Sequence, residues 1–161
     1  MQVFIGSCVW RQVYVGHMKA VMGLLRQPGF GYFPQTGDAL IERARNISAT
    51  YFLRETQADI HLSIDSDIVG FTPEDTLKMC ESVEEHGIVG GAYVCRSPVR
   101  TFPATFYEDG VRVEHSFDHT PVKVKWLATG FMAVHRRVFE KMAENLTLLH
   151  RSEGQRAFYN F

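Results

Sequence analysis

The sequence predicts an α/β protein with a mostly parallel, open sheet and helices on both faces of that sheet. Short apolar runs alternate with helical periods through about residues 1–95, in the order strand, helix, strand, helix, strand, helix, strand. Parallel strands need crossover connections of this kind, and the crossover helices cover both faces of the sheet. After about residue 96, two short runs flank a turn, so we expect a small antiparallel part near the C-terminus.

The first strand is expected over residues 2–9, a mostly apolar run of the kind found in buried parallel strands. Apolar residues at helical spacing then predict a helix over residues 17–25, which Pro28-Gly29 closes. A second short strand is expected over residues 30–33. These elements form the first strand-helix-strand unit.

The next helix has the clearest period in the chain. Gly37-Asp38 opens it, with Asp38 as the expected cap. Arg45 lies at the edge of its apolar stripe, and Asn46 falls on the far face. The stripe consists of Leu40, Ile41, Ala44, Ile47, Ser48, Tyr51 and Phe52.

A strand over residues 60–64 follows and ends in Asp65-Ser66-Asp67. Thr72-Pro73-Glu74-Asp75 is a capping box with proline at the first helical position, and it predicts a helix that stops at Gly87. A fourth strand is expected over residues 88–94.

The pattern of the later part favours antiparallel pairing. Residues 101–107 and 111–115 alternate around a turn signal and predict a hairpin. Further strands are expected over residues 122–127 and 131–134, and a short helix over residues 137–145.

Length and charge narrow the class of protein. At 161 residues, without a repeat or a linker, the chain is expected to form one domain over residues 1–161. A formal net charge of −1 provides no basic field for nucleic acid or an anionic membrane. No apolar run reaches the length of a transmembrane helix, and the start lacks a signal-peptide pattern. We therefore expect a cytoplasmic protein with no transmembrane segment and no nucleic-acid partner.

The cysteines agree with this compartment. Cys8, Cys80 and Cys95 are odd in number and widely spaced, which argues against a disulfide framework or a zinc site. Their apolar neighbours predict buried, reduced thiols.

Asp65 and Asp67 form the candidate site. In an open α/β sheet, ligands bind beyond the carboxyl ends of the strands, where both aspartates are expected. Side chains two apart on a strand share a face and lie about 7 Å apart, close enough to share a hydrated ion. Carboxylate oxygens suit Mg²⁺ or Mn²⁺, which commonly bridge a protein carboxylate to a diphosphate. Aspartates are also common turn formers at strand ends, so a structural role is the alternative.

Four segments of the chain carry a resemblance to a known family. They are Leu40–Asn46, Ile64–Ile68, Gly90–Tyr93 and Thr129–Phe139. In this order and spacing they resemble GT-A-fold glycosyltransferases, in particular the short family-2 type of bacteria and phages. The resemblance covers about residues 3–145. It implies a nucleotide-diphospho-sugar transferase fold in which about residues 1–95 bind the nucleotide. About residues 96–161 would then supply the hairpin, a strand and a short helix.

The resemblance implies a transferase that moves a sugar from a nucleotide-diphosphate donor, with Mn²⁺ or Mg²⁺ as cofactor. Asp67 would be the more direct metal ligand, and Asp65 would share the metal while lying nearer the ribose or the donor sugar. The acceptor, whether glycan, lipid, protein or small molecule, is not indicated. The other donor-binding residues would be Ser7 and Val9 at the nucleobase, Arg45 at the nucleotide, and Gly130 and Phe131 at the donor sugar. Phe131 could equally belong to the core, and Arg45 could be a solvated arginine.

The family pattern is not matched at the end of the chain. Family members continue from a segment like Ala157–Phe161 into an acidic motif that supplies the base of an inverting transfer, and a histidine follows later. The resemblance therefore assigns no catalytic base in this sequence and expects one beyond Phe161.

This departure keeps other functions open. A catalytically incomplete module that binds a nucleotide or a metal is one alternative, and a purely structural α/β domain is another. A sugar-phosphate nucleotidyltransferase is less favoured, because its first strand is usually followed by a glycine-rich, basic loop. The corresponding segment Gly6–Arg11 has one glycine and one arginine.

Two further polar clusters are expected to be solvated. Glu114-His115 and Asp118-His119 fall in an expected loop, where the spacing of the two histidines does not favour a metal. His135 and Arg136-Arg137 are expected at the surface, where a helix starts.

Overall fold

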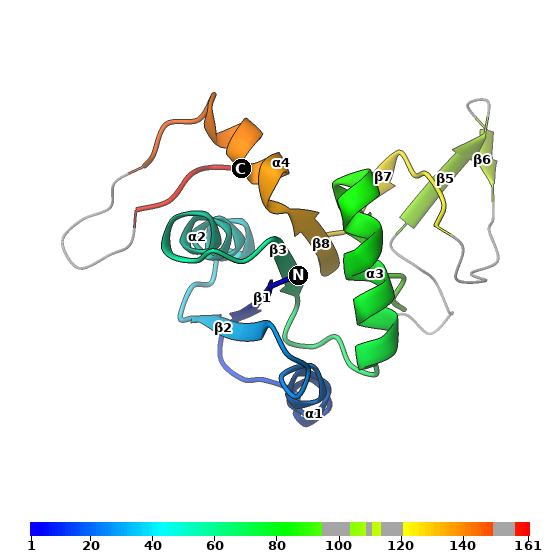
Figure 1. The fold of residues 1–161 in the computed structure, drawn as a ribbon, viewed down its shortest axis with the longest axis horizontal. Coiled ribbons are helices and arrows are strands. Elements are labelled where there is room, and N and C mark those ends of the chain that lie inside the picture. Colours follow the sequence, from blue (N-terminus) through cyan, green and yellow to red (C-terminus); the bar gives the residue numbers. More distant parts are fainter. Residues whose placement is uncertain (95–103, 109–110, 114–120, 150–156) are drawn as a thin grey trace.

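The structure is a computed structural model that describes residues 1–94, 104–108, 111–113, 121–149 and 157–161. Its centre is a five-stranded sheet in the order β2-β1-β3-β8-β4 (Figure 1). The strands of this sheet are β1 (Val3–Val9), β2 (Phe30–Thr36), β3 (Ile60–Ile64), β4 (Ile88–Gly90) and β8 (Phe131–His135).

Four of the five strands run in one direction. β1 pairs in parallel with β2 and β3, whereas β8 is antiparallel to both of its neighbours, β3 and β4. The predicted α/β class with a mostly parallel open sheet is confirmed. The alternation of strands and helices does not predict that the late strand β8 lies between β3 and β4.

Two pairs of helices cover the sheet, one pair on each face (Figure 1). On one face lie α1 (Val15–Leu24) and α3 (Pro73–His86), and on the other lie α2 (Ile41–Glu55) and α4 (Arg136–Ala143). Successive side chains of a strand point to opposite faces, so neighbouring residues of β1 belong to two different cores. Ile5 packs with Leu24 on the side of α1, whereas Phe4 packs with Phe52 on the side of α2.

A second, small antiparallel sheet has the order β6-β5-β7. Its strands are β5 (Ala104–Glu108), β6 (Val111–Val113) and β7 (Trp126–Leu127). The predicted hairpin is confirmed as the pair β5 and β6. The strand expected over residues 122–127 is shorter, because only Trp126 and Leu127 pair with β5.

Three predictions lie outside the described residues. They concern the turn at Asp109-Gly110, the solvated cluster of Glu114-His115 and Asp118-His119, and the thiol of Cys95. The other two cysteines, Cys8 and Cys80, are free, and Cys80 is buried.

The start of α2 corrects the prediction for Asp38. The helix begins at Ile41, and Leu40 before it provides no side-chain cap. Asp38 accepts a hydrogen bond from the Leu40 N–H at 3.0 Å and pairs with Arg43, whose Nε lies 2.6 Å from Asp38 Oδ2. The Asp38 carboxylate, which was expected to cap the helix, is therefore bound by the Arg43 guanidinium instead. Leu40 and Ile41, predicted to begin the buried stripe, are exposed.

The far face of α2 is buried as well. Asn46 is 7% exposed, and its Nδ2 donates to Asn160 Oδ1 at 2.9 Å. On the same face, Thr50 Oγ1 accepts a hydrogen bond from the Tyr159 N–H at 2.9 Å. Residues 157–161 thus lie along α2 (Figure 1), and the predicted outward position of Asn46 is wrong because this segment covers it.

The capping box of α3 is confirmed. Thr72 Oγ1 accepts a hydrogen bond from the Asp75 N–H at 3.1 Å, and Pro73 occupies the first helical position. Gly87 ends the helix with a φ of 78°, a conformation that favours glycine.

Arg136 is not the solvated group that its neighbourhood in the sequence suggests. Its guanidinium lies 4.5 Å from the centre of the Phe52 ring. It also donates hydrogen bonds of 2.7–3.0 Å to four carbonyl oxygens at the end of α2 and just beyond it, those of Phe52, Leu53, Thr56 and Ala58. Helix carboxyl ends leave such acceptors unsatisfied, so Arg136 ties α4 to α2. His135 caps α4 by accepting a hydrogen bond from the Arg137 N–H at 3.1 Å.

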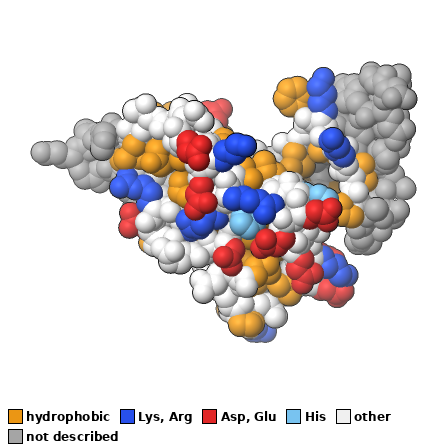
Figure 2. All heavy atoms as spheres, turned by 45° about the horizontal axis from the view of Figure 1, so that its top comes forward, with side chains coloured by type: hydrophobic (Ala, Val, Ile, Leu, Met, Phe, Trp, Pro, Cys, Tyr) orange, Lys and Arg blue, Asp and Glu red, His pale blue; other side chains and the backbone are white. Residues whose placement is uncertain are grey.

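The surface agrees with the low net charge. Figure 2 shows acidic and basic side chains interspersed over the face that it displays, without a field of one sign. Among the described residues, no helix combines the length and apolar character needed to cross a membrane.

His61 lies in the core between β3 and the pair α2 and α4. It is 4% exposed, and its Nε2 lies 3.1 Å from Ser48 Oγ. Its ring packs against Phe4, Phe52 and Phe139. Burial lowers the pKa of this imidazole to about 3, so the ring is neutral in the folded protein at neutral pH.

We expect the free energy of unfolding to fall when the pH is lowered from about 7.5 to about 5. In the unfolded chain His61 takes up a proton near pH 6.5, whereas in the folded protein its pKa is about 3. The stability that depends on neutral His61 is therefore fully present above pH 6.5 and is lost as the pH falls towards 3. The loss at pH 5 is about 2 kcal/mol, measurable by urea unfolding at both pH values.

The control is His61→Gln, which keeps a polar group near Ser48 Oγ. This variant should unfold more easily at about pH 7.5, yet depend on pH less steeply than the native chain, by the same about 2 kcal/mol. An unchanged pH dependence in His61→Gln would contradict the assignment to this residue.

Candidate functional site

The candidate site lies where β3 ends, at Asp65. The Asp65 N–H donates to the Gly130 carbonyl at 2.8 Å, which continues the pairing of β3 with β8 by one residue. The Ile68 N–H then donates to the Asp65 carbonyl at 2.9 Å, so residues 65–68 form a turn. The strand spacing predicted for Asp65 and Asp67 is therefore wrong, because the chain leaves the extended conformation between them.

Arg45 reaches this turn from α2. Its Nη2 lies 2.8 Å from both carboxylate oxygens of Asp65, and each of the two side chains is about one quarter exposed. The buried Nε of Arg45 has no hydrogen-bond partner among the described residues. The alternative of a solvated Arg45 is thus excluded, since the guanidinium is held against the first aspartate of the turn.

Gly130 is closely surrounded by side chains. A Cβ at this position would lie 2.5 Å from Tyr93 Oη and 3.1 Å from Asp65 Oδ2. The backbone can come this close to Asp65 because glycine has no side chain. Phe131, the next residue, is buried and packs its ring against Phe71 at 5.5 Å between centres. The structure therefore places Phe131 in the core, next to the site.

A cleft of about 330 Å³ opens at this edge of the sheet, and both aspartates line it. Two aromatic side chains at its rim, Trp10 and Tyr14, are about half exposed. The rest of the lining comes from β1, from the segment before α2, from the first residue of α2 and from the turn, and consists of Cys8, Asp38, Ala39, Ile41 and Ser66.

Ser7 and Val9 lie beside this cleft with their side chains buried. Ser7 Oγ is 3.2 Å from His17 Nε2, and the Val9 carbonyl accepts a hydrogen bond from the Gly37 N–H at 3.2 Å. Because side chains alternate along a strand, Cys8 between them points to the cleft.

Cys8 is a thiol in this environment. Burial raises its pKa to about 11, against the opposing effect of the Arg45 guanidinium. A thiol that stays protonated at neutral pH is a poor nucleophile, so nothing in its chemistry points to covalent catalysis.

The donor set fits a hydrated divalent ion that is completed by a ligand. Asp65 and Asp67 supply two carboxylates, and Mg²⁺ is commonly held by one or two carboxylates together with substrate phosphates and water. Among the described residues no group of three or more histidine, cysteine or acidic side chains gathers around one point. The residues therefore fit an ion shared with a phosphorylated ligand, and they do not fit a site made by protein ligands alone.

Sequence reasoning missed several lining residues. Trp10 and Tyr14 follow the carboxyl end of β1, which is the edge where ligands bind in such sheets, so their position was a usable signal. The sequence pattern favours a helix cap for Asp38 and, from the apolar neighbours of Cys8, a core position for that thiol.

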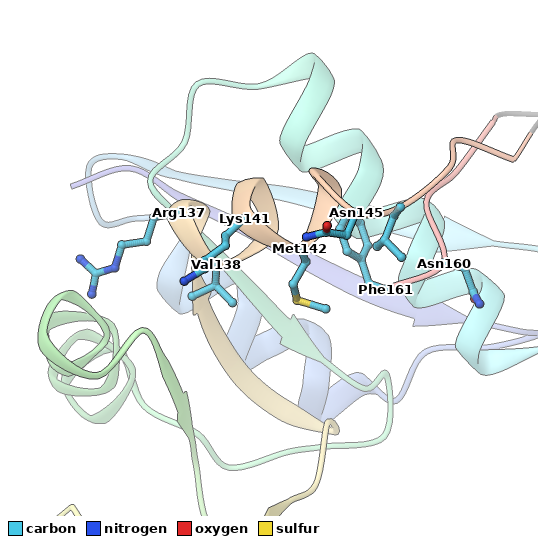
Figure 3. Close-up of a pocket in the computed structure, with 8 residues that line it drawn as sticks. Arg137, Val138, Lys141, Met142, Asn145, Asn160 and Phe161 are labelled. Carbon is cyan, nitrogen blue, oxygen red and sulfur yellow. The ribbon is translucent and has the colours of Figure 1, made fainter.

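A larger groove, of about 710 Å³, lies between α4 and the last residues of the chain (Figure 3). Arg137 and Lys141 stand at its rim, and Val138, Met142 and Phe161 supply apolar walls. It contains none of the predicted site residues. α4 follows the end of β8 that is opposite Asp65, so this groove lies at the other edge of the sheet.

Comparison with known proteins supports the fold. No protein-family model matches the chain, and no curated protein matches it. A solved structure titled A197 from STIV is similar with a TM-score of 0.60 at 17% identity, covering 88% of this chain and 68% of that one. CMP:2-keto-3-deoxy-manno-octonic acid synthetase, solved with CTP, is similar with a TM-score of 0.50 at 12% identity, covering 94% and 80%. At these identities the likeness is one of fold alone.

Proposed function

We propose that the protein is a transferase that binds a nucleotide-diphosphate sugar in the cleft at the end of β3 and passes the sugar to an acceptor. The observation that carries this proposal is that Asp65 and Asp67 line one cleft, with Arg45 and Gly130 beside Asp65. The cleft occupies the edge of the sheet where α/β folds bind ligands. The similarity in fold to a synthetase solved with CTP is consistent with a nucleotide ligand.

Asp67 and Asp65 would hold a Mn²⁺ or Mg²⁺ ion in this proposal. Such an ion supplies positive charge that stabilises the departing nucleoside diphosphate. The turn brings both carboxylates to the cleft, while phosphate oxygens of the donor and water would complete the ion's ligands.

Arg45 has a second task in this proposal. In the free protein its guanidinium neutralises Asp65, with Nη2 at 2.8 Å from both carboxylate oxygens. A bound diphosphate offers the same guanidinium a stronger anionic partner, and planar guanidinium groups suit phosphate. Arg45 would then move from Asp65 to the diphosphate, which leaves the Asp65 oxygens for the ion.

The rest of the cleft suits the remainder of the donor. Trp10 and Tyr14 present exposed aromatic surface on which a nucleobase can stack. The backbone of Ser7 and Val9 lies beside the same space. The backbone of Gly130 would lie close to the donor sugar next to Asp65, because glycine has no side chain.

A sugar-phosphate nucleotidyltransferase is the second candidate, and the similarity to the synthetase favours it. Such an enzyme must bind a triphosphate at the first loop. Here that loop contains one cation, Arg11, whose guanidinium lies 5.6 Å from the centre of the Trp10 ring. This scarcity of positive charge is why we rank it second. A module that binds the nucleotide without turnover is the third candidate.

Replacing Arg45 with Gln should change two affinities in opposite directions. Mn²⁺ alone should bind more tightly, by about tenfold, because a positive charge next to Asp65 has been removed. UDP or another bound nucleoside diphosphate should bind more weakly in the absence of metal, by about tenfold, because a charge-assisted hydrogen bond to phosphate is lost. Isothermal titration calorimetry measures both.

The matched control is Arg54→Gln on the exposed end of the same helix. It should leave both affinities unchanged. Parallel loss of both affinities in Arg45→Gln would contradict the switch of Arg45 between the carboxylate and the phosphate.

Replacing Asp67 with Asn should abolish turnover while the protein stays folded. We expect release of nucleoside diphosphate from UDP-, GDP-, CDP- or TDP-sugars with Mn²⁺, and a fall of at least about a hundredfold in Asp67→Asn, since charge stabilisation of the leaving group is the main catalytic term. Coupled detection of the free diphosphate provides the measurement, and circular dichroism checks the fold.

A parallel assay separates the candidates. Release of pyrophosphate from a nucleoside triphosphate in the presence of sugar acids or sugar phosphates would support the nucleotidyltransferase instead. Binding without either release would support the binding module.

A further inference from the structure

We propose that His17 is a positioning residue that fixes the turn of residues 65–68, and with it the carboxylate of Asp67. This inference rests on the proposed function of that turn. It gives α1 a role in positioning the site. His17 is far from both aspartates in the sequence, and its side chain is fully buried, so it cannot contact a ligand itself.

The geometry of His17 determines its tautomer. His17 is fully buried in the first turn of α1, and its Nδ1 lies 3.0 Å from the Ile68 carbonyl oxygen. A carbonyl can only accept, so Nδ1 carries the hydrogen. In a neutral ring Nε2 then accepts, and Ser7 Oγ at 3.2 Å is the donor. The imidazole thus connects the end of β1 to the end of the turn.

The environment keeps this ring neutral. Burial lowers the pKa of His17 from its usual 6.5, and the hydrogen bond to Ile68 is the next largest influence, in the opposite direction. Phe71 presents its ring at 5.9 Å between centres and 72° between planes, which adds an apolar neighbour. The hydrogen-bonding pattern is therefore stable at neutral pH.

The two ends of the turn are held by different parts of the fold. The sheet holds the first end, through the 2.8 Å bond from the Asp65 N–H to Gly130. The segment around the start of α1 holds the rest, because the Tyr14 N–H donates to the Ser66 carbonyl at 3.3 Å and His17 Nδ1 donates to the Ile68 carbonyl. Asp67 stands between these two anchored carbonyls. After them come Val69 and Gly70, both exposed, while Ile68 and Phe71 pack against the core on the side of α1.

The consequence is specific to Asp67. Asp65 is fixed by β8 and by Arg45, independently of His17. The backbone of Asp67, which we assign as the more direct metal ligand, lies between the two carbonyls that Tyr14 and His17 bond. Loss of an outer-shell group that orients a metal ligand through hydrogen bonds typically lowers metal affinity by about 10- to 100-fold.

Two substitutions at position 17 separate the hydrogen bonds. An asparagine amide occupies the place of Nδ1, so His17→Asn can still donate to Ile68. A glutamine amide reaches the place of Nε2, so His17→Gln keeps the contact with Ser7 and loses the one with Ile68. Both variants remove the aromatic ring, so the loss of packing is similar in the two.

The first measurement is hydrogen exchange of the Ile68 amide by NMR, without any ligand. We expect exchange about five- to tenfold faster in His17→Gln, and near the native rate in His17→Asn, because one hydrogen bond of the turn is lost only in the former. The second measurement is titration with Mn²⁺ alone, followed by the electron paramagnetic resonance of the free ion. His17→Gln should bind Mn²⁺ about tenfold more weakly and His17→Asn within about twofold of the native chain.

Equal effects of the two variants on both readouts would overturn the proposal, because they would report only the lost packing. Native behaviour of His17→Gln would also overturn it. His61→Gln, on the other face of the sheet, is the control for general destabilisation, and it should leave the Ile68 amide unchanged relative to the other core amides. If the native chain binds Mn²⁺ neither alone nor together with UDP, GDP, CDP or TDP, the proposed function fails, while the exchange rates still decide the role of His17.

A second pair of variants addresses the same turn without touching the core. Tyr14 has φ of −69°, a value that proline adopts, so Tyr14→Pro removes the N–H bonded to Ser66 with little change in backbone. Compared with Tyr14→Ala, which keeps the N–H, it should exchange the Ile68 amide about fivefold faster. Identical exchange in the two variants would show that the α1 segment does not hold the turn and would overturn the proposal.

Discussion

The pairing of β3 with β8 is the constraint from which the geometry of the site follows. β8 enters the sheet antiparallel between β3 and β4, in a register that sets Ile64 opposite Phe131. One step beyond this pair, the Asp65 N–H donates to the Gly130 carbonyl, and the absence of a side chain at Gly130 lets Tyr93 Oη and the Asp65 carboxylate lie close to its backbone. β8, a late segment of the chain, thereby contributes the Gly130 carbonyl to the site at the carboxyl end of β3.

The site depends on contacts from both layers of helices. α2 lies on one face of the sheet and supplies Arg45, which neutralises Asp65, whereas α1 lies on the other and holds the carbonyls on either side of Asp67. Asp65 continues the pairing of β3 with β8, whereas Asp67 lies in the turn beyond the strand. The two carboxylates therefore have different supports, which gives a physical basis for assigning them different tasks.

Local patterns predicted most of the fold, and the errors came from contacts between distant residues. The apolar strands and the capping box of α3 could be predicted because their signals lie within a few neighbouring residues. The position of β8, the burial of Asn46 under the end of the chain, and the hydrogen bonds of Arg136 to the end of α2 could not, because each depends on a partner far away in the sequence. At the site, the sequence predicted that both aspartates and Arg45 share one edge, and they do. It did not predict the turn between the aspartates, or the aromatic rim that begins at Trp10.

The central claim is that the cleft binds a nucleoside diphosphate together with a divalent ion, and thermal unfolding tests it most directly. UDP, GDP, CDP and TDP are compared with and without Mn²⁺. A nucleotide present at about 100 times its dissociation constant stabilises the folded state by about 2.7 kcal/mol. For a chain of 161 residues this corresponds to a rise in Tm of about 5–10 °C. We predict such a rise for at least one nucleotide, larger with Mn²⁺ than without it. An unchanged Tm with all four nucleotides, with and without Mn²⁺, would contradict the account.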